Sequence, residues 1–153
     1  MTKIQKMPFA EFKKVYTKVP KLSVEVIILE GDKILLTRRA IAPAIGLWHT
    51  PGGTVLKGEK IQDTAKRVAK EEIGLTIDVI KLLGYIEYSN YENEYEKGVA
   101  LALLVAPKGN KKIVLDAQSD KYDYFSELPK NTLRVQRDFF EQNLGLKVSV
   151  KKY

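Results

Sequence analysis

The spacing of apolar and polar residues predicts a helix followed by a β-hairpin at the start of the chain. Over residues 8–19 the apolar positions recur every three or four residues, which is the period of an amphipathic helix. Two runs rich in β-branched residues follow at 22–30 and 33–39, with a Gly-Asp pair between them. A short glycine-containing link between two such runs is typical of a β-hairpin.

The rest of the chain alternates between turn-rich, helical and strand-like patterns. Residues 41–58 are rich in glycine and proline and are expected to form loops and turns, whereas residues 61–73 form a helix that Gly74 ends. The later elements are a helix at 131–143 and strands at 76–89, 97–107, 122–125 and 146–152. This order predicts a single domain over residues 1–153, of the α/β (α+β) class, with helices packed on a mixed sheet.

The composition is that of an ordinary globular protein. Of the 153 residues, 44% are hydrophobic and 29% are charged, and no apolar run approaches the roughly 18 residues of a membrane span. The N-terminus lacks the continuous apolar core of a secretory signal, so we expect a cytoplasmic protein with no membrane partner. The net charge of +7 comes from scattered lysines, which argues against nucleic acid as a partner and fits a solvated surface or a polyphosphate substrate.

The absence of cysteine restricts the kind of metal site that the chain can form. A metal must be held by oxygen atoms or by the only histidine, His49. Oxygen ligands favour a hard cation, so Mg²⁺ is expected, with Mn²⁺ as the alternative.

A carboxylate falls on the apolar face of the helix expected at 61–73. On a wheel that advances about 100° per residue, Glu72 lies within the stripe of small and aliphatic residues. Because a buried, unpaired carboxylate costs several kcal/mol, Glu72 must either find a cation, which a divalent ion would supply, or stay protonated. Glu71 lies beside it, and Arg67 sits one turn before Glu71, where an ion pair can orient that acid.

A glycine turn and another acid precede this helix. Gly52 and Gly53 leave the backbone open, so a carbonyl can point at a metal and a phosphate can approach closely. Glu59 follows just before the helix. Such a cluster of acids around a glycine turn suits hard cations that bridge phosphate oxygens and activate water. The alternative is a helix with surface Glu-Lys pairs and an ordinary turn.

These residues resemble the signature of the Nudix hydrolase family. Residues 53–75 match all but one of its fixed positions, in the order Gly, Glu, Arg, Glu, Glu and Gly at the correct spacing. The resemblance implies an αβα sandwich with a mixed sheet and a loop-helix-loop catalytic motif. It also implies the catalytic set Glu59, Arg67, Glu71 and Glu72, in which Glu71 and Glu72 bind Mg²⁺ with the Gly52 carbonyl while Arg67 and Glu59 position the acids. Since dimers are common in this family, a homodimer is an open expectation.

The exception is Val68, which replaces a glutamate that in many members binds metal or acts as the general base. Valine fits the apolar stripe, so the helix itself is expected to be undisturbed. If activity persists, another group must accept the proton. The acidic loop offers Glu92, Glu94 and Glu96, since family members place catalytic groups in the corresponding loop; the alternative is an exposed charged loop.

A second resemblance concerns the segment before the signature. Residues 43–48, Pro-Ala-Ile-Gly-Leu-Trp, followed by Pro-Gly-Gly, are similar to the same segment of GDP-mannose mannosyl hydrolases. Those enzymes also have an incomplete signature and transfer the glycosyl carbon to water. Ala42 and Thr54 depart from two arginines of that group, and its downstream catalytic histidine has no counterpart, because His49 precedes the signature.

Four residues are expected to contact substrate. Arg38 and Arg39 end a predicted strand and can reach a diphosphate, or they mark an exposed strand end. Trp48 can stack on a base, although a lone Trp beside a turn is more often part of the core. Gly53 allows a phosphate to approach closely. His49 either lines the entrance of the cleft or has no role in the site.

Three functions follow from these features. The first is a Mg²⁺-dependent hydrolase of a nucleoside diphosphate linked to another moiety, in particular a nucleotide sugar such as GDP-mannose. The second keeps the metal site but takes nucleoside triphosphates and releases pyrophosphate. The third is a catalytically weak nucleotide-binding regulator, which the replacement by Val68 favours. The first and second differ in loops outside the signature, so the sequence separates them poorly.

Overall fold

The fold is a mixed sheet with helices on both faces, seen in a computed structural model that describes residues 4–89 and 93–153. Its helices are α1 (Phe9–Lys18), α2 (Ile61–Ile73) and α3 (Arg134–Leu144), with a short 3₁₀ helix η1 (Glu94–Glu96). Its strands are β1 (Lys21–Glu30), β2 (Lys33–Arg39), β3 (Trp48–His49), β4 (Gly52–Thr54), β5 (Ile77–Glu87), β6 (Gly98–Pro107) and β7 (Ser119–Phe125).

Strand β1 organises the sheet, whose main order is β3-β2-β1-β6-β5, with β7 paired to β2. It runs parallel to β6 and antiparallel to β2 at its C-terminal end. Near its N-terminal end it pairs instead with β4, which places Glu25 opposite Gly52. The sheet is therefore mixed, as the order of elements predicts.

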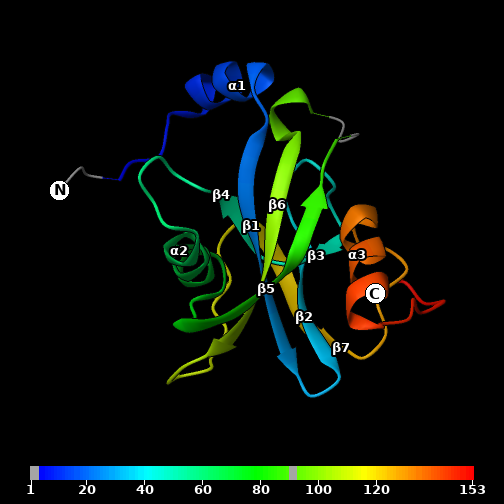
Figure 1. The fold of residues 1–153 in the computed structure, drawn as a ribbon. Coiled ribbons are helices and arrows are strands. Elements are labelled where there is room, and N and C mark those ends of the chain that lie inside the picture. Colours follow the sequence, from blue (N-terminus) through cyan, green and yellow to red (C-terminus); the bar gives the residue numbers. More distant parts are fainter. Residues whose placement is uncertain (1–3, 90–92) are drawn as a thin grey trace.

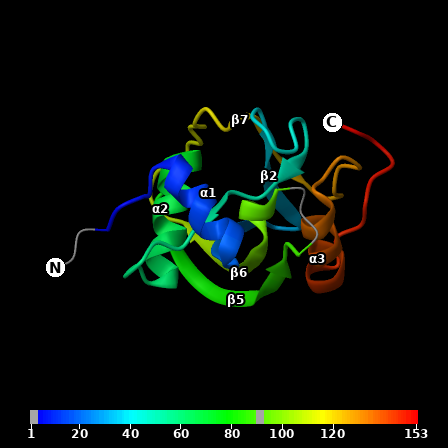
Figure 2. The same cartoon turned by 90° about the horizontal axis from the view of Figure 1, so that it is seen from above.

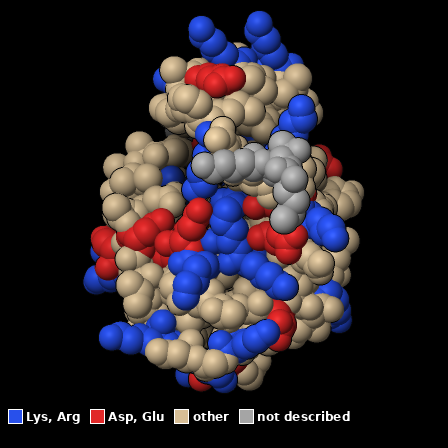
Figure 3. Space-filling view, turned by 90° about the vertical axis from the view of Figure 1, so that its left-hand side faces the viewer, with Lys and Arg blue, Asp and Glu red and all other residues tan. Residues whose placement is uncertain are grey.

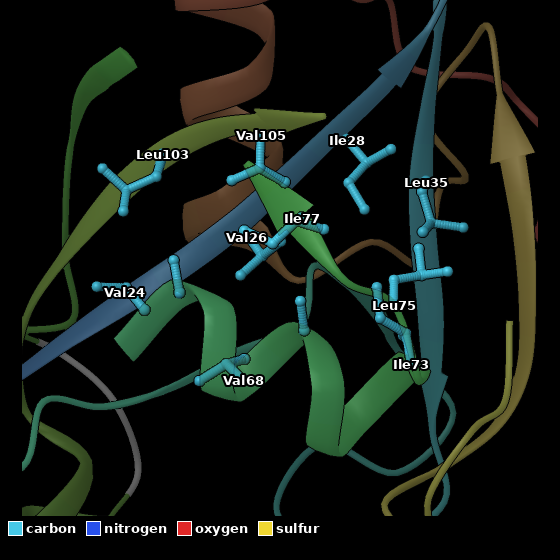
Figure 4. Packing of buried hydrophobic residues seen from close by; sticks show 12 residues of the cluster. Val24, Val26, Ile28, Leu35, Val68, Ile73, Leu75, Ile77, Leu103 and Val105 are labelled. Atoms are coloured by element: carbon cyan, nitrogen blue, oxygen red, sulfur yellow. The ribbon is translucent and has the colours of Figure 1, made fainter. Parts of the chain in front are cut away.

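Helices α2 and α3 cover opposite faces of this sheet (Figure 1). One core cluster joins α2 to the side chains of Val24, Val26 and Ile28, which alternate along β1 (Figure 4). A second cluster lies on the α3 side and includes Ile27 and Phe140. Because β1 is apolar on both faces, one strand contributes to both cores. The expected αβα sandwich is confirmed.

Helix α1 differs from the other two, because it lies across one end of the sheet and not on either face (Figure 2). None of its residues is buried, and its contacts are chiefly with η1. Phe9 and Phe12 pack against Tyr95 of η1, with ring centroids 5.8 and 6.4 Å apart respectively.

Among the described residues, no helix has the length and apolar character that crossing a membrane requires.

Two of the predicted elements need correction. The strand expected at 146–152 is wrong: this segment forms a single bridge, in which the Leu128 N–H donates to Lys147 and the Ser149 N–H to the Leu128 carbonyl. Its backbone thus bonds to Leu128 and, through the Lys151 carbonyl, to Lys130, and not to a neighbouring strand. The turn-rich stretch 41–58 contains β3 and β4, which are too short to show a strand period. Residues 90–92 of the acidic loop lie outside the described residues.

Candidate active site

Helix α2 carries its acids to the edge of the first core. It ends at Gly74, whose φ of 70° is left-handed, as the predicted stop requires. Val68 is 1% exposed and packs in the core, as its place on the apolar stripe predicts. Its Cγ2 atom lies 2.8 Å from the position that a Cβ on Gly53 would take. Residue 53 therefore has to be glycine for β4 to lie against the helix.

A two-pronged ion pair connects this helix to the loop before it. Arg67 donates from Nε to Glu59 Oε2 at 2.8 Å and from Nη2 to Glu59 Oε1 at 3.0 Å. Arg67 Nη2 also donates to the Thr54 carbonyl at 2.9 Å. The bonds from Arg67, together with that from Thr64, lower the pKa of Glu59 to about 2. Both residues therefore fix the glycine turn relative to the helix, which is the positioning role that the family resemblance implies.

Glu72 approaches the glycine turn from the helix side. Its Oε2 accepts from the Gly52 N–H at 3.3 Å. Desolvation by burial, followed by the nearby charges of Glu25 and Asp116, raises the pKa of Glu72 to about 8. The odd placement of this acid on the apolar stripe is thus a real feature of the fold, and its charged form needs a cation.

Glu25 of β1 approaches the same turn from the other side and was missed in the sequence analysis. Its Oε2 lies 2.3 Å from the position that a Cβ on Gly52 would take, so only glycine fits opposite it. The side chain is 7% exposed, and desolvation by burial raises its pKa to about 7. One pattern in the sequence indicates it: Glu25 is the single charge inside an otherwise apolar stretch of a strand buried on both faces.

Glu71, by contrast, points outward. It is 41% exposed and pairs with Lys6 Nζ at 2.8 Å and with Arg67 Nη1 at 3.4 Å. The pair with Arg67 is the i,i+4 contact that the helical spacing predicts. As a metal ligand Glu71 stays a prediction, because its carboxylate here faces Lys6 instead of the two buried acids.

Two adjoining cavities meet at the glycine turn. The smaller has a volume of about 100 Å³, and the larger about 760 Å³. Gly52, Gly53, Glu72, Glu96 and Gln118 line both of them. Glu25, Arg39 and His49 line the smaller cavity. Lys6, Phe9, Phe12, Glu59 and Arg67 line the larger one. Of the signature residues, Gly53 and Glu72 therefore sit where the two cavities join, whereas Glu59, Arg67 and Glu71 line the larger cavity alone.

The expected substrate-binding residues separate into two groups. Arg39 lines the smaller cavity, and Gly53 lines both. Arg38 lies outside both cavities and forms a two-pronged pair with Asp120, at 2.9 and 2.8 Å. The successive residues of a strand point to opposite faces, so only one arginine of the pair can face the site.

Base stacking on Trp48 is wrong. Its side chain is 3% exposed, and its ring packs edge-on against Phe125 in the second core, with centroids 4.9 Å apart. Its Nε1 donates to the Tyr153 carbonyl at 3.0 Å. His49 of β3 is also buried, although it lines the smaller cavity. Burial and the nearby charge of Arg39 lower its pKa to about 3, so this imidazole is neutral.

The acidic loop places one of its candidate bases at the site. Glu96 lines both cavities and pairs with Lys21, which lines the smaller one. Glu94 is 65% exposed and pairs with Lys97. Glu92 lies outside the described residues. Of the two described candidates, only Glu96 can therefore reach a bound substrate.

The donor set fits a hard divalent cation. Within the described ranges, no group of three or more Asp, Glu, His or Cys side chains is arranged to hold a metal. Two partly or fully buried carboxylates nevertheless approach the same glycine, Gly52, and the nearby charge of Glu25 raises the pKa of Glu72. Mg²⁺ commonly takes one or two carboxylates and completes its shell with water and substrate phosphates. Such an ion would remove the repulsion between these two acids.

The charges on this side of the molecule are mixed. Lys and Arg side chains gather in a central group with Asp and Glu on both sides of it (Figure 3). A surface with adjacent basic and acidic groups suits a substrate that carries phosphates together with a metal ion, since the basic groups attract the phosphates and the acids attract the cation.

Comparisons with known proteins agree with this geometry. A model of the NUDIX domain matches residues 19–138. The chain is 37% identical over 83 residues to a low-salt glycan biosynthesis protein of Haloferax volcanii, covering 54% of this chain and 53% of that protein. It is 33% identical over 113 residues to the ADP-ribose pyrophosphatase of Methanocaldococcus jannaschii, covering 72% of this chain and 66% of that protein. The matches thus leave a third or more of each relative uncovered.

A solved structure shares the fold. The MutT NUDIX hydrolase from Burkholderia pseudomallei superposes with a TM-score of 0.73 at 28% sequence identity, covering 81% of this chain and 98% of that one. The family match covers well over half of the present sequence and includes the whole of the glycine turn and helix α2. The chain therefore belongs to the NUDIX domain family.

Proposed function

We propose that the protein is a Mg²⁺-dependent hydrolase of a nucleoside diphosphate linked to a second group, with a nucleotide sugar such as GDP-mannose as the first candidate. The observation that carries this proposal is the meeting of Glu72 and Gly52 with a basic side chain, Arg39, around one cavity. Acids for a cation and a guanidinium for phosphate oxygens are the two requirements of diphosphate chemistry.

Glu72 and the Gly52 carbonyl would hold the metal, with Glu71 joining them if it leaves Lys6. The bound cation supplies Lewis-acid polarisation of the phosphate oxygens and lowers the pKa of bound water. The chain's own residues then act around it. Arg39 binds the diphosphate, while Arg67 and Glu59 hold the glycine turn in place. Glu96, at the junction of the cavities, is the described acid placed to accept a proton from water.

The larger cavity is of the size that a nucleotide needs. Its volume of about 760 Å³ lies within the range of about 300–1,000 Å³ that is usual for small-molecule sites. Phe9, Phe12 and Tyr16 of α1 form an aromatic part of its wall. Aromatic rings stack on any nucleobase, so we place the base against α1 and the diphosphate at the glycine turn.

A sugar-linked substrate has two supports. The segment 43–48 is similar to that of GDP-mannose mannosyl hydrolases, and it lies beside Arg39, whose Nε donates to the Pro43 carbonyl. The relatives include a protein named for glycan biosynthesis and an ADP-ribose pyrophosphatase. ADP-ribose is itself a nucleoside diphosphate joined to a sugar.

A nucleotide-binding regulator is the second candidate, because Val68 is buried and provides no carboxylate where many members have one. The two candidates share the cavity and the metal site. They differ in turnover: a regulator is stabilised by its ligand but releases no product.

A screen of nucleoside diphosphate sugars and nucleoside triphosphates with Mg²⁺, scored by product identity, tests the proposal. Wild type is compared with Glu72→Gln and with Asp63→Asn, an exposed acid on the same helix. We expect turnover of a diphosphate sugar that Glu72→Gln abolishes and Asp63→Asn preserves. Turnover of triphosphates alone would reject the substrate class. Thermal stabilisation by a nucleotide without any product would favour the regulator.

A further inference from the structure

Glu25 is a buried acid in the site that neither the signature nor the positioning residues account for. It lies in the middle of β1, between Val24 and Val26, whose side chains are fully buried in the first core. Its own side chain points to the other face of the sheet and lines the smaller cavity. A charged group in such a strand is costly to bury unless it is paired. The Glu25 carboxylate is therefore expected to have a partner that offsets the cost of burying its charge.

A closed ring of hydrogen bonds holds this carboxylate in one orientation. Tyr88 donates to Oε1 and Thr50 Oγ1 to Oε2, both at 2.9 Å. Gln136 of α3 closes the ring, because its Nε2 donates to the Tyr88 hydroxyl at 2.9 Å and its Oε1 accepts from the Thr50 N–H at 2.8 Å. The ring fixes Glu25 from three separate segments of the chain but supplies no full positive charge.

The cations near Glu25 have other close partners. Lys21, on the same strand, pairs with Glu96, and Arg39 donates to the Pro43 carbonyl. Across the turn, Glu72 accepts from the Gly52 N–H, while the Glu25 carboxylate fills the space that a Cβ on Gly52 would take. Two acids thus converge on one residue from α2 and from β1. The charge of Arg39 favours the ionised form of both acids and that of Lys21 favours ionised Glu25, yet among the described residues neither cation forms an ion pair with Glu25 or Glu72.

The convergence of Glu25 and Glu72 on Gly52 is significant because position 68 has no acid. Val68 is buried against Gly53, so helix α2 cannot offer a carboxylate from that position. We propose that Glu25 supplies the second buried carboxylate of the divalent-metal site, opposite Glu72 across Gly52. The strand thereby replaces the ligand that the helix has lost. This inference rests on the proposed function, because it requires that the site binds a divalent cation.

The charges balance in this arrangement. Two carboxylates neutralise one divalent ion, and the remaining coordination positions stay open to water and to substrate phosphates, as Mg²⁺ prefers. Tyr88 and Thr50 would then act as partners of the ligand, fixing the orientation of Glu25 while its remaining lone pairs face the ion. Replacing Glu25 should therefore affect metal affinity more than folding.

Titration with Mn²⁺, followed by electron paramagnetic resonance, tests the proposal without relying on turnover. Glu25→Gln keeps the size of the side chain and its place in the ring, since the Thr50 hydroxyl can accept as well as donate. Glu30→Gln, an exposed position at the end of the same strand, is the matched control. We expect Glu25→Gln to weaken Mn²⁺ binding at least about ten-fold and the control to bind as wild type does.

Thermal unfolding in EDTA distinguishes a ligand from a merely structural acid. We expect Glu25→Gln to unfold at the wild-type temperature or higher, because it removes a buried charge. A lower unfolding temperature together with wild-type Mn²⁺ affinity would overturn the proposal. Absence of Mn²⁺ binding by wild type would reject the metal-dependent function, and the inference with it. If Glu25→Gln does not fold, Glu25→Asp serves instead, and wild-type Mn²⁺ affinity in that variant would overturn the ligand role.

Discussion

Arg67 and Glu59 are joined by two parallel hydrogen bonds, of 2.8 and 3.0 Å, that cross from helix α2 to the loop before it. The Glu59 carboxylate is 4% exposed and also accepts from Thr64 and from the Leu56 N–H. Both oxygens of the Glu59 carboxylate are therefore engaged in structural hydrogen bonds. Glu59 holds the turn that carries Gly52 and Gly53 against the helix, and so keeps the proposed metal site assembled.

Arg67→Lys should show how much this geometry contributes. A lysine keeps the charge but cannot form the planar two-pronged contact and also reach the Thr54 carbonyl. We expect the free energy of unfolding to fall by about 1.5–3 kcal/mol, the usual worth of hydrogen bonds to charged groups. Urea denaturation measures it, with Arg134→Lys, an exposed position on α3, as the control. Equal losses of unfolding free energy in Arg67→Lys and Arg134→Lys would contradict a special role of the two-pronged pair.

The same pair predicts a defined dependence of stability on pH. Because the folded-state pKa of Glu59 is lowered from 4.5 to about 2, its stabilising contribution is complete above the unfolded value and is lost as the pH falls toward 2. The stability difference between wild type and Glu59→Gln should therefore narrow by about 1–2 kcal/mol between pH 6 and pH 3. Urea denaturation at the two values measures this, and a difference that does not change with pH would count against it.

Regular elements with a clear period were predictable from the sequence. The hairpin of β1 and β2, helix α2 with its stop at Gly74, and the strands β5 and β6 all form where the pattern placed them. Glu72 was predictable for the same reason, since an acid within an apolar helical stripe departs from a strong period. The strand expected at 146–152 failed because a short alternation indicates a strand without showing that a neighbour is available to pair with it.

Glu25 and Trp48 were less accessible to sequence reasoning, because tertiary contacts decide both. Glu25 becomes part of the site only when β4 folds back against β1, and the turn-rich stretch gives little indication of that pairing. Trp48 ends the segment that resembles that of GDP-mannose mannosyl hydrolases, yet it belongs to a two-residue strand that turns the ring into the α3-side core. Local patterns give the elements, but not which face of a short strand meets the cavity.

Substitution of Phe12 tests the proposed place of the nucleobase. Phe12→Leu keeps an apolar side chain but cannot stack, whereas Phe12→Tyr keeps the ring. We expect Phe12→Leu to raise KM for the nucleotide substrate about ten-fold with kcat little changed, since stacking is worth about 1–3 kcal/mol per base. Phe12→Tyr should remain near wild type. Equal KM values for Phe12→Leu and Phe12→Tyr would show that the nucleobase does not stack on Phe12. Because α1 has no buried residue, neither change should unfold the protein.

Trp48→Phe separates a core residue from a substrate contact. The change removes the hydrogen bond to the Tyr153 carbonyl and leaves space beside Phe125. We expect the free energy of unfolding to fall by about 1–3 kcal/mol, because a large buried side chain is shortened. KM should stay within about two-fold of wild type, since losses of stability and of ligand binding are independent here. A large rise in KM without loss of stability would indicate that Trp48 does contact the nucleobase. Circular dichroism follows unfolding, as this is the only tryptophan.

Val68→Glu restores the residue that many family members have, and its effect decides what the replacement means. The valine is 1% exposed and its Cγ2 atom lies against Gly53, so a longer, charged side chain must displace β4 or stay unpaired in the core. We expect a loss of stability of roughly 1–3 kcal/mol or more without metal and no gain in turnover, since Glu25 already provides the second carboxylate. Val68→Gln, equal in size but uncharged, is the control that separates bulk from charge. A rise in kcat in Val68→Glu that is absent from Val68→Gln would show instead that the site lacks a base, and that the protein's natural role is to bind its nucleotide more than to cleave it.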